Sequence, residues 1–490
     1  MGSLKTRKQV RFWLNDTFIE LENLSPTQNL LDFLRLQSGL RGTKEGCAEG
    51  DCGACTVLVG RLSGDDLVYE AVNACIRFTA SLDGCHVVSI EHLQGQNGQL
   101  HPVQAAMVAL HGSQCGFCSP GIVMSLYALW MNRPNADKNA IERALQGNLC
   151  RCTGYVPIIR AARKALAEGG QSADPLVNER QQMLEKLTEL ADGARVEMGS
   201  DGERLILPAN VDDLARVLVE CPQATLVAGA TDVGLWVTKF MRDLGTVVFT
   251  SHLEELHMVL EGEEGVTFGA GVTFSQFWPL VHSRFAAMGD FWGRIGGEQV
   301  RNMGTIGGNI ANGSPIGDTP PALIALGAAL TLRKGDKRRF LPLEEFFIAY
   351  GKQDRAPGEF VESISIPYLS EGDQFAVYKI SKRREEDIST LCGAFRLRLD
   401  ASNRVEEIVI AFGGMAGIPK RANIVEKLIS GRVWDQNTIA LGKAAFARDF
   451  TPMSDVRGSA EYRMLSVQNL LQRFYLETQG QSQELKRGVL

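Results

Sequence analysis

The alternation of hydrophobic and polar positions changes its period several times along this chain. Near the N-terminus, Val10–Leu14 and Thr17–Leu21 flank an Asn-Asp dipeptide, which is the pattern of a β-hairpin. Residues 29–37 then place apolar side chains at helical spacing, and strand-like runs continue as far as residue 74. We therefore predict a β-rich domain over residues 6–92.

The next stretch, 93–167, is predicted to be helical. Four segments within it place apolar residues at helical spacing: 101–111, 122–130, 137–145 and 157–167. Residues 168–200 are predicted to be a linker, because small and polar residues at 169–175 favour a flexible chain. An amphipathic helix near 179–190 is expected within that linker.

The remainder of the chain alternates predicted strands and helices. A helix at 209–219 and a short apolar strand at 225–228 begin a mixed α/β domain over 201–370. A smaller α+β domain over 371–480 has these expected elements: strands at 375–380, 391–399 and 405–412, and helices at 427–441 and 461–476. The polar end, 479–490, is expected to fray. The pattern as a whole predicts a multidomain α+β protein.

Composition narrows the functional class. With 490 residues, the chain is long enough for about three or four domains. A formal net charge of −6 gives no reason to expect nucleic acid as a partner. The longest apolar runs are too short to span a bilayer, and the polar, basic N-terminus has no secretory pattern. We therefore expect no membrane partner and a cytoplasmic protein whose thiols stay reduced.

Eight of the eleven cysteines fall into two sets of four. The first set has Cys47, Cys52 and Cys55 in a C-x4-C-x2-C run, with Cys75 further on. This is the plant-type ferredoxin spacing of a 2Fe-2S cluster, and the glycines around it would let a loop wrap the cluster. A structural zinc site and disulfides are the alternatives, and disulfides need an oxidising compartment.

The second set consists of two short pairs. Cys115 and Cys118 form C-x2-C, and Cys150 and Cys152 form C-x-C. Both pairs lie beside predicted helix ends, where the partial positive charge of a helix N-terminus favours an anionic cluster. From the spacing alone, an iron–sulfur cluster and a zinc site both stay open. Three further cysteines are predicted to be inert thiols: Cys85, Cys221 and Cys392.

Two loops of small residues mark the predicted α/β domain. One follows the strand at 225–228, and the other covers 305–309, with 314–318 close behind. Such a loop before a helix can bring backbone N–H groups to a phosphate, although each alone could be an ordinary turn. Neither has the G-x-G-x-x-G pattern, so a Rossmann dinucleotide site is not predicted.

Together these motifs resemble the molybdenum hydroxylases, a family that includes xanthine dehydrogenase, aldehyde oxidase and carbon monoxide dehydrogenase. Beside the first cysteine run, the resemblance rests on QCGFCSPG at 114–121 and GNLCRCTGY at 147–155. It implies a 2Fe-2S cluster at each cysteine set, in a β-grasp ferredoxin-like domain and a four-helix 2Fe-2S domain. It also places Gln114 against the pterin of a molybdenum cofactor; a helix-capping amide is the alternative.

The segments 226–233, 301–310 and 314–318 are similar to the FAD domain of the same family, which is of the vanillyl-alcohol-oxidase/PCMH type. This resemblance implies pyrophosphate contacts from the two small-residue loops. The FAD contacts that it implies are Leu226, Val227, Ala228, Gly229, Ala230, Thr231, Asp232, Val233, Ile295, Thr305, Ile306, Gly307, Gly308, Asn309, Asp318, Val361 and Lys379. Ile295 stands where relatives carry phenylalanine, and Val361 replaces a leucine.

The charged run 382–387 resembles a family loop that lies over the flavin and influences the access of NAD. Without that context it would be a solvated face. Glu386 stands where relatives often carry aspartate. Tyr350 matches an aromatic residue that the family sets near the flavin ring, although a core tyrosine is the alternative. These two residues are the candidates for the flavin and NAD side.

The resemblance implies electron transfer in place of acid–base catalysis, so no catalytic residue is assigned. Electrons would pass from a molybdenum site on a separate large subunit to the helical-domain cluster, the ferredoxin-like cluster, FAD and then NAD. The layout resembles small subunits of bacterial xanthine dehydrogenases, which implies oxidation of hypoxanthine and xanthine to urate by a heterotetramer of two small and two large subunits. The alternatives are a related hydroxylase of an aldehyde or N-heterocycle, a stand-alone electron carrier and a zinc scaffold.

Overall fold

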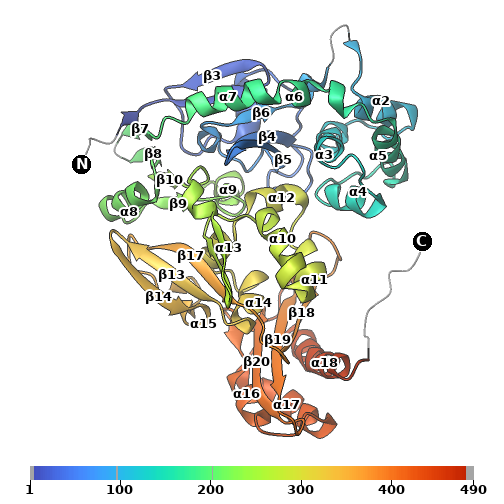
Figure 1. The fold of residues 1–490 in the computed structure, drawn as a ribbon, viewed down its shortest axis with the longest axis vertical. Helices are drawn as coiled ribbons and strands as arrows, with labels where there is room; N and C mark the ends of the chain where they lie inside the picture. Colours follow the sequence, from blue (N-terminus) through green and yellow to red (C-terminus); the bar gives the residue numbers. More distant parts are fainter. Residues whose placement is uncertain (1–4, 95–97, 201, 482–490) are drawn as a thin grey trace. The chain divides into compact units, whose positions relative to one another are not determined.

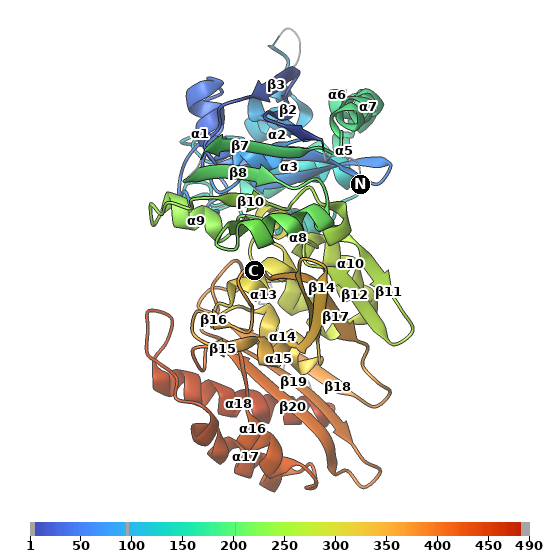
Figure 2. The same cartoon turned by 90° about the vertical axis from the view of Figure 1, so that its left-hand side faces the viewer.

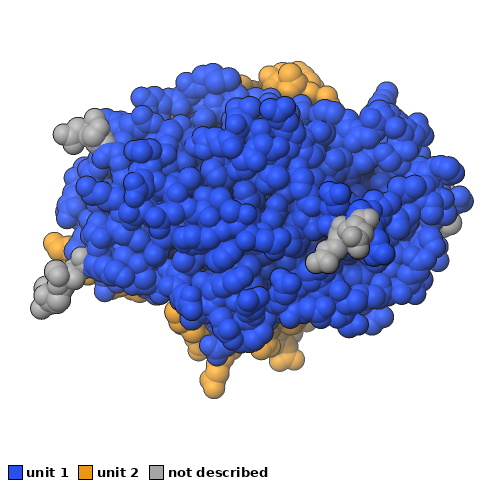
Figure 3. Space-filling model, turned by 90° about the horizontal axis from the view of Figure 1, so that it is seen from above, with its two compact units in different colours: residues 1–257, 273–276, 296–305 blue, residues 258–272, 277–295, 306–490 orange. Residues whose placement is uncertain are grey.

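The computed structural model describes residues 5–94, 98–200 and 202–481. Figure 1 shows the helices and strands of the chain, and Figure 3 shows its two compact units in different colours. Unit 1 comprises residues 1–257, 273–276 and 296–305, and unit 2 comprises residues 258–272, 277–295 and 306–490. Among the described residues, no helix combines the length and the apolar character that crossing a membrane requires.

Unit 1 begins with the predicted ferredoxin-like sheet, whose order is β3-β2-β6-β4-β5. Its strands are β2 (Val10–Leu14), β3 (Thr17–Leu21), β4 (Thr56–Ser63), β5 (Asp66–Asn73) and β6 (His86–Val88). The predicted hairpin is confirmed, and Asn15 takes the positive φ of 52° that its turn requires. The predicted helical segment is α1 (Leu30–Asp32), which continues as the π-helix η1 (Phe33–Gln37) and packs on Val10, Phe12 and Leu14.

Four helices follow, as predicted, and single turns of 3-10 helix connect parts of the unit. The helices are α2 (Pro102–Ala109), α3 (Ser119–Asn132), α4 (Lys138–Ala144) and α5 (Val156–Glu168); the turns are η2 (Thr79–Leu82) and η3 (Ile90–Leu93). Helix α3 is the centre of this bundle, because its residues from Gly121 to Trp130 are buried. The Asp137 side chain begins α4 by accepting the backbone N–H of Ala140 at 2.8 Å.

The predicted linker, residues 168–200, contains the amphipathic helix that was predicted near 179–190, and its small polar stretch is folded as well. It forms η5 (Gln171–Ala173), α6 (Pro175–Asn178) and α7 (Arg180–Leu190). Asp174 is buried, where it accepts hydrogen bonds from Tyr127 at 2.8 Å and pairs with His101 at 3.2 Å. The polar composition therefore reflects specific buried hydrogen bonds, which fix the segment against α3 and correct the expectation of flexibility.

The second sheet of unit 1 has the order β1-β7-β8-β10-β9. Its strands are β1 (Thr6–Arg7), β7 (Arg195–Ser200), β8 (Glu203–Leu207), β9 (Thr225–Val227) and β10 (Val247–Phe249); the helices nearby are α8 (Val211–Glu220), α9 (Val233–Thr238), η6 (Glu254–His257) and α12 (Glu298–Met303). Strand β1 pairs parallel with β7 and so belongs to this sheet, although it precedes the ferredoxin-like strands.

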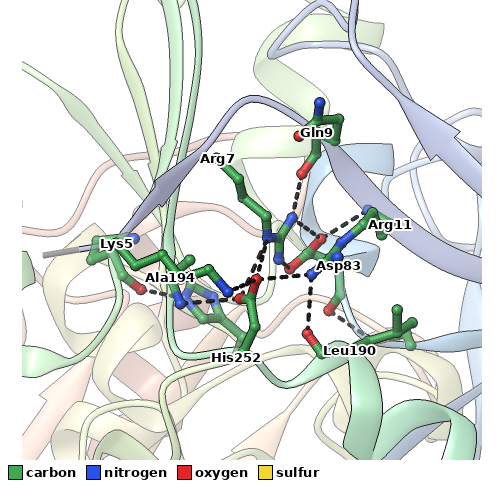
Figure 4. A network of polar contacts seen from close by, with 11 residues as sticks. Lys5, Arg7, Gln9, Arg11, Asp83, Leu190, Ala194 and His252 are labelled. Carbon is green, nitrogen blue, oxygen red and sulfur yellow. Dashed lines mark hydrogen bonds and ion pairs between the residues drawn. The ribbon is translucent and has the colours of Figure 1, made fainter.

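A polar network fastens the two sheets of unit 1 to each other (Figure 4). Arg7 donates to Asp83 at 2.9 Å and also pairs with Asp192 at 3.4 Å. Arg11 contacts the same two carboxylates, through its backbone N–H at 2.8 Å and its side chain at 3.0 Å. Lys5 completes the network with an ion pair to Asp192 at 3.2 Å.

Unit 2 contains an antiparallel sheet of order β11-β12-β17-β13-β14. Its strands are β11 (Val259–Glu261), β12 (Gly265–Gly269), β13 (Ala329–Lys334), β14 (Lys337–Pro342) and β17 (Phe360–Pro367), and a small hairpin is made by β15 (Phe347–Ala349) and β16 (Lys352–Gln353). Helix α10 (Phe274–Arg284) begins in residues assigned to unit 1. The other helices are η7 (Ala286–Met288), α11 (Gly289–Gly293), α13 (Ile306–Asn312), α14 (Thr319–Ala325) and α15 (Leu343–Phe346).

The C-terminal part of unit 2 is a four-stranded antiparallel sheet with helices on one face (Figure 2). It consists of β18 (Gln374–Ile380), β19 (Leu391–Leu399), β20 (Val405–Gly413), β21 (Lys420–Arg421), α16 (Asn423–Ile429), α17 (Gln436–Asp449) and α18 (Ala460–Thr478). The single helix predicted at 427–441 is wrong. Gly431 has a φ of +72°, which ends α16, and the Asp435 side chain caps a new helix. Most of the tail expected to fray lies outside the described residues.

Candidate redox centres

The structure brings the first cysteine set together. All four residues are free thiols, located before β4 and after β5. The Sγ atoms of Cys55 and Cys75 are 3.3 Å apart. The Cys47 Sγ accepts backbone N–H groups of Glu49, Asp51 and Cys52, each at 3.4 Å. The loop therefore directs its amides at sulfur, as expected for a loop around an iron–sulfur core.

The pKa values of the thiols in this first set depend strongly on one another. Hydrogen bonds from Cys52 and Cys75 lower the pKa of Cys47 far below its usual range. The contact with Cys47 raises the pKa of Cys52, and contacts with Cys47 and Cys55 raise that of Cys75, with burial adding to both. One thiolate is thus stabilised at the expense of its neighbours. Four thiolates here would need the positive charge of bound iron.

Three glycines shape this loop. A Cβ atom at Gly46 would lie 2.7 Å from the Cys52 Sγ, and one at Gly53 would lie 2.0 Å from the carbonyl oxygen of Gly147. Gly50 and Gly53 also have φ values of +79° and +68°, which side chains disfavour. The glycines therefore allow the loop to wrap around the space between the thiols, as predicted, and side chains at these positions would overlap neighbouring atoms.

The second cysteine set forms two pairs. In addition to burial, the neighbouring Cys150 raises the pKa of Cys118, and the neighbouring Cys115 raises the pKa of Cys152. No three His, Cys, Asp or Glu side chains of the described residues are placed to hold a single metal ion. Contact of the sulfurs in pairs suits a two-iron core, because each iron of such a core binds two thiolates.

Helix ends position this second set, as predicted. Cys118 is the N-cap residue of α3, and Tyr155 is that of α5. The Tyr155 hydroxyl accepts the backbone N–H of Cys150 at 2.9 Å, and Thr153 contacts the Cys150 Sγ at 3.2 Å. Burial raises the pKa of Cys118 to about 12, whereas hydrogen bonds from Thr153 lower that of Cys150 in spite of burial.

Two of the four thiols of the second set are open to solvent, whereas Cys150 is buried. Cys115 and Cys152 are exposed, in contrast to the buried Cys55 and Cys75 of the first set. Gln114 is exposed too and does not cap α3, whose N-cap makes no side-chain hydrogen bond. The apolar side chains of Phe117, Leu149 and Val156 are exposed in the same two cysteine motifs and at the start of α5.

The two cysteine sites contact each other through their loops. The backbone N–H of Leu149 donates to the carbonyl oxygen of Cys52 at 2.9 Å. The Asn148 side chain donates to the carbonyl oxygen of Gly53 at 3.3 Å. Gly121 on α3 fits against the same carbonyl, because a Cβ atom there would lie 2.1 Å from it. The sequence patterns indicated two sites and did not indicate this contact.

The helix that follows the predicted FAD loop of unit 1, residues 226–233, contacts the first cysteine site. Helix α9 follows the loop, and its Thr238 hydroxyl donates to the carbonyl oxygen of Ala48 at 2.6 Å. Gly234 packs so closely that a Cβ atom would lie 2.8 Å from the carbonyl oxygen of Ile76. The ferredoxin-like site is therefore the cysteine site that this loop adjoins within unit 1.

Unit 2 carries most of the other predicted FAD residues, whereas Thr305 lies in unit 1. Asp318 and Lys379 form a buried ion pair, and Ser389 also donates to Asp318. Arg294, absent from the sequence predictions, donates to the carbonyl oxygen of Lys379 at 2.9 Å. The structure thus joins two predicted residues from distant motifs.

The remaining unit 2 candidates differ in accessibility. Gly307 lies against Ala270, whose carbonyl oxygen would be 2.5 Å from a Cβ atom at Gly307. Ile295 is partly buried, and Val361 is buried in β17. Of the other residues predicted at the start of α13, Ile306 is buried, whereas Gly308 and Asn309 are accessible.

The two candidates for the flavin and NAD side differ in exposure, because Tyr350 is exposed and Glu386 is partly buried. Tyr350 is 78% exposed at the β15–β16 hairpin, so the alternative of a core tyrosine is wrong. Glu386 has a φ of +52° in the loop that joins β18 and β19. That loop has no helix or strand and is held by contacts such as the Arg383 N–H to Asp387 at 2.8 Å.

Comparison with known proteins identifies the domains. Four family models match: "2Fe-2S iron-sulfur cluster binding domain" at 14–78, "[2Fe-2S] binding domain" at 89–163, "FAD binding domain in molybdopterin dehydrogenase" at 198–369 and "CO dehydrogenase flavoprotein C-terminal domain" at 376–478. These domains define an iron–sulfur flavoprotein. The chain belongs to the molybdenum hydroxylase family, as the motifs predicted, and carries its two iron–sulfur domains and its FAD-binding domain.

Individual relatives agree with this family. The xanthine dehydrogenase/oxidase of Rattus norvegicus is 33% identical over 96% of this chain, which spans only 39% of that relative. Among solved structures, a chain of the carbon monoxide dehydrogenase from Hydrogenophaga pseudoflava matches at TM-score 0.52, with 25% identity, 55% coverage of this chain and 93% of that one. Quinoline 2-oxidoreductase from Pseudomonas putida 86 shares the fold at TM-score 0.51, with 23% identity over 56% of this chain and 96% of that one.

Proposed function

We propose that this protein is the electron-transfer subunit of a xanthine dehydrogenase. The observation that carries the proposal is the order of contacts in unit 1. The second cysteine site adjoins the first through Leu149 and Cys52, and the first contacts α9, the helix that follows the predicted FAD loop, through Ala48 and Thr238. Such an order suits electron passage from the surface of the protein towards a flavin.

The chain's own residues would hold the redox groups and tune them. When bound, two 2Fe-2S clusters would carry single electrons, and FAD would collect them in pairs for NAD. The eight thiols of the two sets would ligate the clusters. The amides directed at Cys47 would stabilise its charge, while the exposure of Cys115 and Cys152 gives their site a more aqueous surrounding. These differences would separate the reduction potentials of the two sites.

The FAD contacts remain those predicted from the sequence, with the two units considered separately. In unit 1, residues 226–233 and Thr305 are proposed to contact FAD. In unit 2, the proposal assigns the contacts to Ile295, Ile306, Gly307, Gly308, Asn309, Asp318, Val361 and Lys379. The buried pair of Asp318 and Lys379 supports a polar contact there, whereas the burial of Val361 limits that residue to packing. Tyr350 and Glu386 are proposed to lie on the flavin and NAD side.

A large molybdenum-binding subunit is the proposed partner, and the second cysteine site is the proposed point of electron entry. Cys115 and Cys152 are accessible, and the exposed apolar side chains of Phe117, Leu149 and Val156 would be covered by a partner. Gln114, also exposed, is proposed to contact the pterin. The mass of the assembled complex tests the expected heterotetramer.

The first experiment measures iron, acid-labile sulfide and FAD in the purified chain, and then xanthine-dependent reduction of NAD with the molybdenum subunit. A colourless zinc protein would reject the proposal. Cys115→Ser should remove about half of the iron, because one of two clusters loses a ligand. Cys85→Ser alters a buried thiol outside both sets and serves as the matched control.

A second substrate class deserves the same assay. The quinoline 2-oxidoreductase from Pseudomonas putida 86 is named for an N-heterocycle and shares the fold of this chain. The alternative is therefore an electron-transfer subunit for a hydroxylase of an N-heterocycle or aldehyde. Quinoline and an aromatic aldehyde should be offered to the same complex. Reduction of the iron–sulfur chain by either of these, and not by xanthine, would favour the alternative.

A further inference from the structure

A buried amide lies where the two cysteine sites meet. Gln299 on α12 is fully buried, and its Nε2 contacts the Thr56 Oγ1 at 3.1 Å, the Ser125 Oγ at 3.1 Å and the Asn148 Oδ1 at 3.0 Å. Its three partners come from different segments. Thr56 directly follows the ligand candidate Cys55, Asn148 precedes Cys150 by two residues, and Ser125 lies on α3.

The orientation of this amide follows from its neighbours. The carbonyl oxygen of Gly53 can only accept, so Asn148 must turn its Nδ2 towards it, at 3.3 Å. The Asn148 Oδ1 consequently faces Gln299, which must present its own Nε2 as donor. A primary amide has two hydrogens, so the three contacts share them. Gln299 is thereby locked to both cysteine loops at once.

Helix α12 is itself clamped at further points. Asn302 donates to the carbonyl oxygen of Ala71 on β5 at 2.9 Å. Arg301 donates to Gln146, just before the second cysteine loop, at 3.0 Å. These contacts hold the helix that carries Gln299 against both iron–sulfur domains. Buried hydrogen bonds of this kind are costly to leave unmade, so they resist small displacements.

We propose that Gln299 is a positioning residue that fixes the separation and orientation of the two iron–sulfur sites and so controls electron passage between them. The inference rests on the proposed function, because both sites must hold clusters. In each passage, one electron would move from a cluster held by the second set to a cluster held by the first, so that the former would be oxidised by one electron and the latter reduced by one electron. The hydrogen bonds of the Gln299 Nε2 go to Thr56, Ser125 and Asn148, so Gln299 acts through residues that neighbour the candidate cysteines.

The test uses Gln299→Met in the full chain with both clusters loaded. Methionine keeps the length and burial of the side chain but removes its donors. Electron paramagnetic resonance of the fully reduced protein measures the spin–spin splitting between the clusters, and redox titration measures their potentials. We expect normal iron content with loss of wild-type splitting and slower electron transfer from the second site to the first.

Gln276→Met is the matched control. Gln276 also belongs to unit 1, and its side-chain oxygen accepts the Thr273 N–H at 2.9 Å and contacts His257 at 3.1 Å. Neither of these partners belongs to a cysteine loop. The Gln276→Met variant should keep the wild-type splitting. If Gln299 had only a structural role, Gln299→Met would lower the free energy of unfolding and still keep the wild-type splitting.

The outcomes separate this inference from the proposed function. Wild-type protein without iron overturns both. Wild-type protein with two clusters, combined with unchanged splitting and potentials in Gln299→Met, overturns only the positioning role. Should Gln299→Met fail to fold, Gln299→Asn carries the same test, because it keeps an amide that is one methylene too short to reach all three partners. Unchanged splitting in that variant would also contradict the role.

Discussion

The backbone N–H of Leu149 and the carbonyl oxygen of Cys52 are joined by a hydrogen bond of 2.9 Å. Cys52 belongs to the first cysteine set, and Leu149 directly precedes Cys150 of the second. One backbone hydrogen bond therefore connects the two sites. Because no side chain is involved, only a change of backbone chemistry can remove it cleanly.

Leu149→Pro should separate the two loops. Proline lacks the N–H group and restricts the residue before it, here Asn148. We expect a loss of about 1 kcal/mol or more in the free energy of unfolding, measured in urea, and less iron at the second site. Leu149→Ala keeps the N–H group and removes a side chain that is 40% exposed, so it should resemble wild type. Equal effects of the two substitutions would argue against this hydrogen bond.

Gly53→Ala tests the close approach of the two loops. The left-handed backbone should cost about 1–2 kcal/mol, and overlap with the Gly147 carbonyl should cost roughly 1–3 kcal/mol more. Gly84→Ala is the matched control, because Gly84 has a similar φ of +70° and nothing lies within 4 Å of its added Cβ. Urea unfolding should show the larger loss at Gly53. Equal losses would mean that the loops separate easily.

His86 should make unit 1 sensitive to acid. Burial lowers the pKa of His86 to about 4, while the Asn15 carbonyl accepts from its Nε2 at 2.9 Å and the Tyr69 hydroxyl contacts its Nδ1 at 2.6 Å. Between about pH 6.5 and 4, the His86 imidazole is therefore protonated in the unfolded chain and neutral in the folded chain. Stability should fall across that window as the pH decreases, by about 3 kcal/mol in total.

His86→Gln isolates this contribution. The variant has no imidazole to protonate, so its unfolding free energy should change less between about pH 7 and about pH 5 than that of wild type. Its stability at neutral pH will differ for packing reasons, and the comparison therefore concerns the slope. An unaltered slope would assign the acid sensitivity to other groups.

Asp318→Asn should weaken FAD binding and stability in unit 2. The change leaves the buried Lys379 ammonium without its carboxylate, which costs roughly 3–5 kcal/mol for a buried pair. Flavin fluorescence after gel filtration measures retention of FAD. In the control Asp373→Asn, the partner Arg398 is 30% exposed and can turn to water. Retention of FAD in Asp318→Asn would remove this residue from the proposed contacts.

Local patterns predicted most of the helices and strands and the grouping of eight cysteines into two sets. Cysteine spacing within a loop is a property of neighbouring residues, and the predicted sets are the sets that the structure gathers. The linker around Asp174 was misjudged because its polar residues bond to Tyr127 and His101, far away in the sequence. The predicted helix at 427–441 was wrong because hydrophobic periodicity does not register the left-handed backbone of Gly431, which ends α16.

Gln299 shows the limit of such reasoning more sharply. It is separated from Thr56 by 243 residues and from Asn148 by 151, so no local pattern marks it. A glutamine in a short helix usually indicates a solvated face. Its burial becomes evident only when β4, α3 and the second cysteine loop are assembled around it.

The pairing of β1 with β7 has a consequence for biosynthesis. Lys5 and Asp192, which close the network beside these strands, are 187 residues apart in the sequence. On the ribosome, the nascent chain would expose its first strand until β7 has emerged, even after the ferredoxin-like part has collapsed. The pairing of β1 with β7 is therefore a late step in the assembly of unit 1, and β8, β9 and β10 must still be added to complete the sheet.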